Sequence, residues 1–347
     1  MSMRLGVLDV GSNAAQLQVV DARAGAPPLP IHAVKVPTEL GEEVGAQGSI
    51  SPEGASRVVA AVQQALDAAR GLTVDQLYPF VTAAIRDASN RDAILERVLA
   101  ETGVRLDYLT GEQEARLTYL AVRNWYGWQA GRLLNVDIGG GSMELAFGRD
   151  AVPELAVSLP LGAGRVSTAF LQPDPPSQTQ IKILRQYVRA QLHEVVNRVQ
   201  WEGTPRRVVA TSKTFKQLAR LNGAPRGREG PFVRRTVSRA QVRESIPRLM
   251  DVAARDRGKL RGIKPSRAWQ IVGGAVVAYE TMRCLGIEEA EVSPWALREG
   301  IVLQHLSSLG ADERLALQPM TFHQPQDSAT ITRLREGTSM AGVRSSN

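Results

Sequence analysis

The most informative stretch of the chain is Asp137-Ile138-Gly139-Gly140-Gly141-Ser142-Met143-Glu144. Apolar residues precede it from 133 and follow it to 147, which predicts two strands joined by a glycine-rich turn. Glycines at a strand end let backbone N–H groups surround a phosphate without interference from Cβ atoms. Asp137 and Glu144 add carboxylate oxygens suited to Mg²⁺ or to the positioning of water. The alternative is a plain hairpin turn with an incidental acid at either end.

A dinucleotide-binding glycine motif does not explain this stretch. Its sixth position should be glycine and is Glu144, and the residues that follow are typical of a strand instead of a helix. The chain also lacks the glycine-rich loop with Lys-Ser or Lys-Thr that is typical of nucleoside-triphosphate hydrolases. A phosphate-binding turn between two strands remains the interpretation to test.

A shorter version of the same pattern stands near the N-terminus. Residues 4–10 and 16–21 are apolar segments on either side of Gly11, Ser12 and Asn13, and Asp9 precedes the turn as Asp137 does. By itself this is common turn chemistry. The repeated design indicates an internal duplication, in which two loops facing each other would grip a phosphate chain from both sides.

The rest of the chain alternates between segments typical of strands and of helices, as in an α/β protein. Ser51 and Pro52 begin a helix in which Val58, Val62 and Leu66 recur at four-residue spacing. We also expect strands at 77–82, 106–109 and 208–210, and helices over 90–101, from 111, over 178–200 and from 271 to 282.

Length and composition suit a soluble globular protein of two domains. The chain has 347 residues, of which 43% are hydrophobic and 22% charged. No apolar run approaches the roughly 18–20 residues that a membrane-spanning helix needs, and the N-terminus has no signal-peptide layout. The four histidines and one cysteine show no zinc-ligand spacing. We therefore expect a cytoplasmic protein with no membrane partner.

The positive charge is concentrated in one segment. Residues 181–271 contain 22 Lys or Arg against 6 Asp or Glu, a net +16 in a chain whose total is +7. Two interpretations are open: an arginine-rich solvated surface, or a positive field that attracts an extended polyanion. With only six Phe and six Tyr, an aromatic platform for single-stranded nucleic acid is disfavoured. No stable nucleic-acid complex is expected.

Two carboxylates, Glu112 and Glu114, stand at the start of the helix that begins at Gly111. Acids in a first helical turn are favoured by the helix dipole alone. Either one is also a candidate general base for an attacking water. Composition does not choose between these interpretations.

Taken together, these segments resemble the exopolyphosphatase/guanosine pentaphosphate phosphohydrolase (Ppx/GppA) family of the actin/Hsp70/sugar-kinase superfamily. The chain is most similar to the short actinobacterial exopolyphosphatases, through residues 211–215 and the lack of length for an extra C-terminal helical domain. The matching segments, in the order and spacing of the family, are 8–13, 84–90, 110–117, 137–144, 158–165 and 293–300.

The resemblance implies an α/β fold of two ribonuclease-H-like lobes with the active site in the cleft between them. The first lobe is expected over residues 1–125, and a C-terminal helix at about 299–310 would pack back on it. The second lobe is expected over 126–298 and contains the basic segment 181–271. Residues 311–347 form a polar tail that we expect to be partly disordered. A homodimer is also implied.

The resemblance further assigns roles to individual residues. Glu114, and not Glu112, takes the place of the catalytic glutamate that orients or deprotonates water. Phosphate contacts fall on Gly11, Ser12, Asn13, Arg86, Gly139, Gly140, Gly141 and Ser142. Asp9, Asp137 and Glu144 would hold Mg²⁺, or Mn²⁺ in its place. Together these groups supply the positioning and charge neutralisation that phosphoryl transfer requires.

One departure from the family pattern concerns the first loop. The family usually has Ser or Thr and then, two residues on, Arg or His, where this chain has Ala14 and Gln16. We expect activity because Glu114 is retained, with reduced rate or shifted substrate. The expected function is release of terminal phosphate from inorganic polyphosphate. The alternatives are hydrolysis of guanosine pentaphosphate and a polyphosphate- or nucleotide-binding regulator with little turnover; a sugar kinase is disfavoured for want of a sugar-binding motif.

Overall fold

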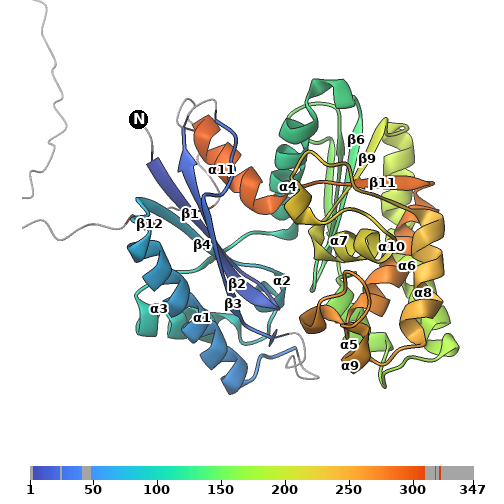
Figure 1. Ribbon diagram of the computed structural model, residues 1–347, viewed down its shortest axis with the longest axis horizontal. Coiled ribbons are helices and arrows are strands. Elements are labelled where there is room, and N and C mark those ends of the chain that lie inside the picture. Colours follow the sequence, from blue (N-terminus) through green and yellow to red (C-terminus); the bar gives the residue numbers. More distant parts are fainter. Residues whose placement is uncertain (1–2, 24–25, 41–47, 309–316, 318–319, 322–347) are drawn as a thin grey trace, which may run out of the picture.

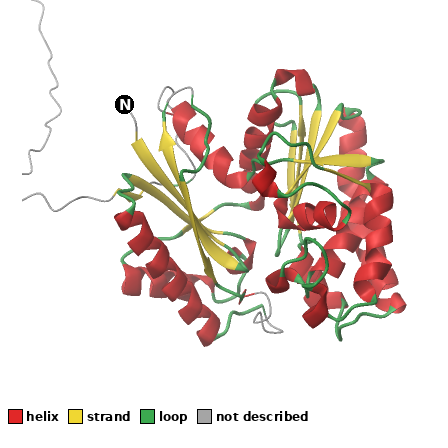
Figure 2. Ribbon diagram, viewed as in Figure 1, coloured by secondary structure: helices red, strands yellow, loops and turns green. Residues whose placement is uncertain are grey.

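The computed structural model describes residues 3–23, 26–40, 48–308, 317 and 320–321. The chain folds into two lobes, each built on one β-sheet, with the first lobe blue and the second green to orange in Figure 1. Helices cover the faces of both sheets (Figure 2).

The first sheet has the order β12-β4-β1-β2-β3, with β5 also paired to β4. Strands β1, β2 and β3 form an antiparallel meander, and β4 runs parallel to β1. The predicted hairpin around Gly11 is confirmed as β1–β2. The strands are β1 (Met3–Val10), β2 (Ala14–Ala22), β3 (His32–Pro37), β4 (Gln76–Val81), β5 (Asp107–Tyr108) and β12 (Met320–Thr321).

The second sheet repeats this topology with the order β10-β11-β9-β6-β7-β8. Its meander is β6-β7-β8, and β9 runs parallel to β6 as β4 does to β1. The duplication and the two ribonuclease-H-like lobes predicted from the sequence are therefore confirmed. The strands are β6 (Leu133–Ile138), β7 (Met143–Gly148), β8 (Leu155–Leu159), β9 (Arg207–Thr211), β10 (Thr236–Ser238) and β11 (Glu289–Val292).

Helices bury one face of each sheet and form the two main cores. In the first lobe, α1 (Pro52–Gly71) packs on β2 and β3 beside α3 (Arg91–Thr102). Ser51 caps α1 as predicted, because its side chain accepts a hydrogen bond of 3.0 Å from the Gly54 N–H. The second lobe centres on α10 (Ile271–Cys284), which contacts α5 (Ala163–Phe170), α6 (Gln178–Glu202) and α8 (Arg239–Met250).

Two helices lie between the sheets. The helix α4 (Gly111–Tyr126) packs on β7 and β8 of the second sheet and also against α11 (Leu297–Ser308). In turn α11 packs on β1 and β2 of the first sheet through Ile301 and Val302. The expected boundary at 125/126 thus falls at the end of a helix that contacts both lobes, so α4 is positioned by both.

Only a small part of the tail at 311–347 falls within the described residues. Leu317 is buried in the first lobe, and β12 pairs antiparallel with β4. The disorder expected for the remainder lies outside the described residues. Among the helices that the structure describes, none has the length and apolarity needed to span a membrane.

Candidate active site in the interlobe cleft

A cleft of about 220 Å³ lies between the lobes, where the meander turns of both sheets meet. Every residue that the sequence analysis assigned to the site lines this cleft except Arg86. They are Asp9, Gly11, Ser12, Asn13, Glu114, Asp137, Gly139, Gly140, Gly141, Ser142 and Glu144. Residues more than 130 positions apart in sequence are thus brought to one place.

The two predicted loops face each other closely across the cleft. A Cβ atom added to Gly140 would lie 2.5 Å from the Ser12 Oγ, and one added to Gly141 would lie 2.8 Å from the Ala83 Cβ. Neither distance leaves room for a side chain, so glycine is required by the approach of the lobes. Within the described residues, the backbone N–H groups of Gly140 and Gly141 have no protein acceptor. They are available to an anion in the cleft.

The start of α5 holds the second loop in place. The Ala163 N–H donates to the Gly139 carbonyl and the Gly164 N–H to the Gly140 carbonyl, both at 2.9 Å. Arg165 donates from Nε to the Gly141 carbonyl and from Nη2 to Asp87 of the first lobe, both at 2.7 Å. The carbonyl groups of the glycine turn therefore point to α5, which leaves its N–H groups for the cleft.

The structure separates the two glutamates at the start of α4. Glu112 points to solvent, where it pairs with Arg116 at 2.8 Å and keeps 57% of its side chain exposed. Glu114 is only 7% exposed and lines the cleft. A capping box on Thr110 and Gln113 fixes the helix start, and with it the direction of Glu114.

Arg86 lies beside Glu114, outside the cleft lining. It ends the short helix α2 (Ala83–Arg86), and its Nη1 donates to Glu114 Oε1 and, at 3.1 Å, to the Leu109 carbonyl. Its Nε donates to Asp87 at 2.9 Å. In this arrangement the guanidinium of Arg86 contacts the glutamate, whereas the sequence analysis placed it on phosphate. The direction of a side chain is not visible in a motif.

The other three acids each have a partner at the cleft wall. Thr211 Oγ1 donates to Asp137 Oδ2 at 2.6 Å, and Ser158 Oγ donates to Glu144 Oε1 at 2.8 Å. Arg298 approaches Asp9 to 3.6 Å. The two hydroxyl groups hold the carboxylates of Asp137 and Glu144 in a fixed orientation at the cleft.

Four carboxyl groups in one enclosed space disfavour one another's charge. Burial, and then repulsion by Glu144, raises the pKa of Glu114 well above its ordinary value, against the opposing effect of Arg86. Burial and the charge of Asp137 raise the pKa of Glu144 to about 7. Desolvation also raises the pKa of Asp9 and Asp137. Perturbed carboxyl groups of this kind are typical of catalytic sites.

Cations line the same cleft as the acids, and the sequence analysis did not single them out. Two signals were present: the basic segment 181–271 contains four of them, and Arg298 stands in the motif at 293–300. The six cations that line the cleft are Lys35, Lys213, Lys216, Lys264, Arg267 and Arg298.

The cations of the basic segment lie in two kinds of place. Several of its arginines form surface ion pairs, such as Arg239 with Glu288 and Arg207 with Glu291. Others, including Lys213 and Lys264, line the cleft. Surface pairs of the first kind contribute little to stability.

Lys35 lies beside Gln16, one of the two positions at which the chain departs from the family pattern. Gln16 on β2 lies directly opposite Lys35 on β3, and both line the cleft. Directly opposed residues of antiparallel strands share one face of the sheet. Lys35 therefore places a cation beside the position where the resemblance implies Arg or His.

The carboxyl groups of the cleft have the donor chemistry of a magnesium site. Asp9, Asp137 and Glu144 offer hard carboxylate oxygens, and their mutual repulsion would be relieved by a divalent cation. In the part of the chain that the structure describes, no three His, Cys, Asp or Glu side chains are grouped as a ready-made metal site. Magnesium commonly binds through one or two carboxylates together with substrate phosphates.

Comparisons with known proteins agree on one family. The profile described as "Ppx/GppA phosphatase family" matches residues 18–309. The protein named Exopolyphosphatase 1 of Mycobacterium tuberculosis is 45% identical over 341 residues, which cover 96% of this chain and 99% of that protein. Exopolyphosphatase 1 of Mycobacterium leprae is 45% identical over 306 residues, which cover 88% and 90%.

Solved structures show the same fold. The Ppx/GppA family member from Aquifex aeolicus is 25% identical and superposes with a TM-score of 0.73 over 89% of this chain and 99% of that one. An exopolyphosphatase from Cytophaga hutchinsonii has a TM-score of 0.80 over 88% and 98%, and at 22% identity it supports the fold alone.

Proposed function

The chain belongs to the Ppx/GppA phosphatase family, and from that membership we propose that it is an exopolyphosphatase that releases terminal orthophosphate from inorganic polyphosphate. The two mycobacterial relatives that share 45% of its residues carry that name. The observation that carries the proposal is one cleft lined both by carboxyl groups around Glu114 and by six cations. A water held by the acids would face a phosphate held by the cations.

Glu114 is the candidate base in this arrangement. Its raised pKa makes it a stronger proton acceptor than an ordinary glutamate, and Arg86 fixes its direction. Water would attack the terminal phosphorus and give a proton to Glu114, while the bond from phosphorus to the bridging oxygen breaks. The shortened chain leaves with the electron pair of that bond.

The free N–H groups of Gly140 and Gly141 and the cations Lys216, Arg267 and Arg298 would neutralise the phosphate oxygens. Most of the rate acceleration in phosphoryl transfer comes from such positioning and charge stabilisation. The glycine loops cannot adjust much, since each is packed against the other lobe. A preformed phosphate cradle is the result.

Magnesium, with manganese as a substitute, would be held by one or two of the carboxylates of Asp9, Asp137 and Glu144 together with phosphate oxygens of the substrate. When bound, such an ion would screen the charge of the phosphate oxygens and position the substrate. The carboxylates would then remain ionised in spite of their burial.

Hydrolysis of guanosine pentaphosphate is the second candidate, and one feature favours it. A cavity of about 620 Å³ adjoins the cleft and shares Ser12, Gly140 and Gly141 with it. Trp269 and Gln270 line this cavity, and the buried Gln270 Oε1 has no hydrogen-bond partner among the described residues. An indole ring suits the base of a nucleoside.

The test is phosphate release with Mg²⁺ from short polyphosphate, long polyphosphate and guanosine pentaphosphate, compared by kcat/KM. Preference for polyphosphate supports the proposal, and preference for the nucleotide supports the second candidate. Tight binding without turnover of any of them would favour the regulator. The homodimer, the cytoplasmic location and the lack of a stable nucleic-acid complex stay predictions, which sedimentation, fractionation and nucleic-acid binding assays would check.

A further inference from the structure

The cations of the cleft lie at two depths. Lys216, Arg267 and Arg298 are half-buried beside the acids, whereas the other three keep more than a third of their surface exposed. These three form what we call the outer lysines: Lys35, Lys213 and Lys264. They come from three separate places: β3 in the first lobe, the first turn of α7 (Ser212–Leu221), and the loop before residue 265.

Among the described residues, the outer lysines have no counter-ions of their own. Within the described residues, none of their ammonium groups takes part in an ion pair or a side-chain hydrogen bond, although surface cations such as Lys259 and Arg97 do. An unpaired lysine on a surface is ordinary. Three that line one cleft are better explained by a shared anionic occupant.

The outer lysines also repel one another and their neighbours. Desolvation, and then the charges of Lys264 and Arg267, lower the pKa of Lys35. Desolvation in the cleft, and then the charges of Lys216 and Arg298, lower the pKa of Lys213 to about 7. The fold holds these cations together against electrostatic repulsion, which a bound polyanion would relieve.

We propose that Lys35, Lys213 and Lys264 bind the second and later phosphates of a linear polyphosphate. The terminal phosphate of this chain lies between Glu114 and the three half-buried cations described above. This inference rests on the proposed function and specifies its substrate. The occupant is a chain of closely spaced charges, because the lysines stand on both lobes and at the mouth of one cleft. Guanosine pentaphosphate divides its phosphates between two positions of one ribose, so it presents only a short run of charges, whereas a linear polyphosphate continues past the terminal site; the outer lysines therefore favour the polymer.

Lys35 has a particular part in this arrangement. It stands opposite Gln16 in the β2–β3 register, at the position where the resemblance implies a cation. A cation on either strand would reach the same part of the cleft. Moving the charge from position 35 to position 16 should therefore preserve binding.

The experiment measures binding in a Glu114→Gln background, so that it does not depend on turnover. Pyrophosphate, tripolyphosphate and tetrapolyphosphate are titrated by calorimetry at several salt concentrations. Lys35→Met, Lys213→Met and Lys264→Met are each expected to weaken tetrapolyphosphate binding about three- to tenfold. Each should also reduce the slope of log Kd against log salt by about one, and pyrophosphate should be affected less.

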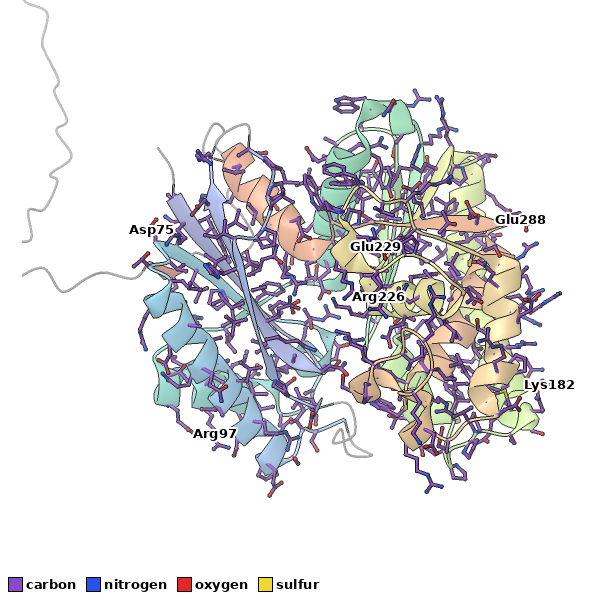
Figure 3. All side chains as sticks on the ribbon, viewed as in Figure 1. Asp75, Arg97, Lys182, Arg226, Glu229 and Glu288 are labelled. Carbon is purple, nitrogen blue, oxygen red and sulfur yellow. The ribbon has the colours of Figure 1, made fainter. Side chains whose placement is uncertain are left out.

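Lys182→Met is the matched control, because Lys182 lies on α6 at the far edge of the second lobe (Figure 3). It should leave both affinity and salt slope unchanged. Gln16→Arg should restore tetrapolyphosphate affinity to the Lys35→Met protein. Equal losses for every chain length, or an unchanged salt slope, would overturn the proposal, and failure of Gln16→Arg to rescue would overturn the assignment of Lys35.

The two proposals fail separately. If tetrapolyphosphate binds through the outer lysines and the unsubstituted protein hydrolyses none of the substrates, the proposed function fails and this inference stands. If hydrolysis proceeds and the lysine variants bind all chain lengths as the parent does, this inference fails and the proposed function stands.

Discussion

Arg86 forms an ion pair with Glu114: its Nη1 donates to Glu114 Oε1 and to the Leu109 carbonyl, while its Nε donates to Asp87. The guanidinium thus touches the candidate base and does not line the cleft. A charge in this place has two effects. It orients the carboxylate, and it lowers a pKa that burial and Glu144 raise.

Removing Arg86 should therefore shift the pH dependence as well as the rate. In Arg86→Gln the pKa of Glu114 rises further, so the acid side of the kcat/KM profile moves to higher pH, and kcat at neutral pH falls about 10- to 100-fold through misplacement of the base. Arg86→Lys keeps the charge and should shift the profile less. A slower Arg86→Gln enzyme with an unmoved profile would refute the electrostatic role.

The unsubstituted enzyme should lose activity on acidification. Burial and repulsion by Glu144 raise the pKa of Glu114 well above its ordinary value, so this carboxyl group takes up a proton at a higher pH than an ordinary glutamate does. A protonated carboxyl group cannot accept a proton from water. We expect kcat/KM to fall on acidification at a pH well above the range in which an ordinary glutamate is protonated. Activity that stays constant well below neutral pH would contradict the raised pKa of Glu114.

The charge of Lys213 should affect substrate binding as the pH rises above neutrality. Its pKa of about 7 means that the free enzyme loses this charge as the pH rises above neutrality, which weakens attraction for the polyanion. The KM for tripolyphosphate should rise with pH, and less steeply in Lys213→Arg, since arginine stays protonated. The protonation of the substrate changes with pH in the same way for both proteins. The difference between their KM profiles therefore reports the protonation of Lys213. Parallel KM profiles would contradict the prediction.

Gly141 tests the close approach of the lobes. A Cβ at this position would lie 2.8 Å from the Ala83 Cβ and 3.3 Å from the Ala83 carbonyl carbon, so Gly141→Ala must push the two lobes apart. Overpacking of this kind costs about 1–3 kcal/mol, and kcat/KM should fall about tenfold or more. Gly71→Ala is the control, because nothing lies within 4 Å of its added Cβ. Full activity in Gly141→Ala would show that the loops need not approach.

Much of the fold follows from local patterns. The hairpins around Gly11 and Gly140 and the helix capped by Ser51 need only turn chemistry and periodicity, and they form as predicted. The repeat of strand, turn and strand also revealed the duplication. What the patterns do not show is that α4 packs on the second sheet while contacting α11. That packing depends on which apolar faces of distant segments are paired.

The site follows the same division. The acids and the glycine loops lie within short motifs, so the sequence identifies them as candidates. The cations of the cleft come from positions 35, 213–216, 264–267 and 298, and no local spacing links Lys35 to Lys264. Side-chain direction is equally hidden: Glu112 and Glu114 are two residues apart, and only the packing of α4 turns one to solvent and the other to the cleft.

That pair of glutamates provides the most direct test of the central claim. Phosphate release from tripolyphosphate with Mg²⁺ should be measured for the unsubstituted enzyme, Glu114→Gln and Glu112→Gln at one pH. We predict that kcat falls about 10²- to 10⁴-fold in Glu114→Gln, the usual contribution of a general base, and stays within about twofold in Glu112→Gln. Equal activity in the two variants, or undiminished turnover in Glu114→Gln, would contradict the assignment of Glu114 and with it the proposed mechanism.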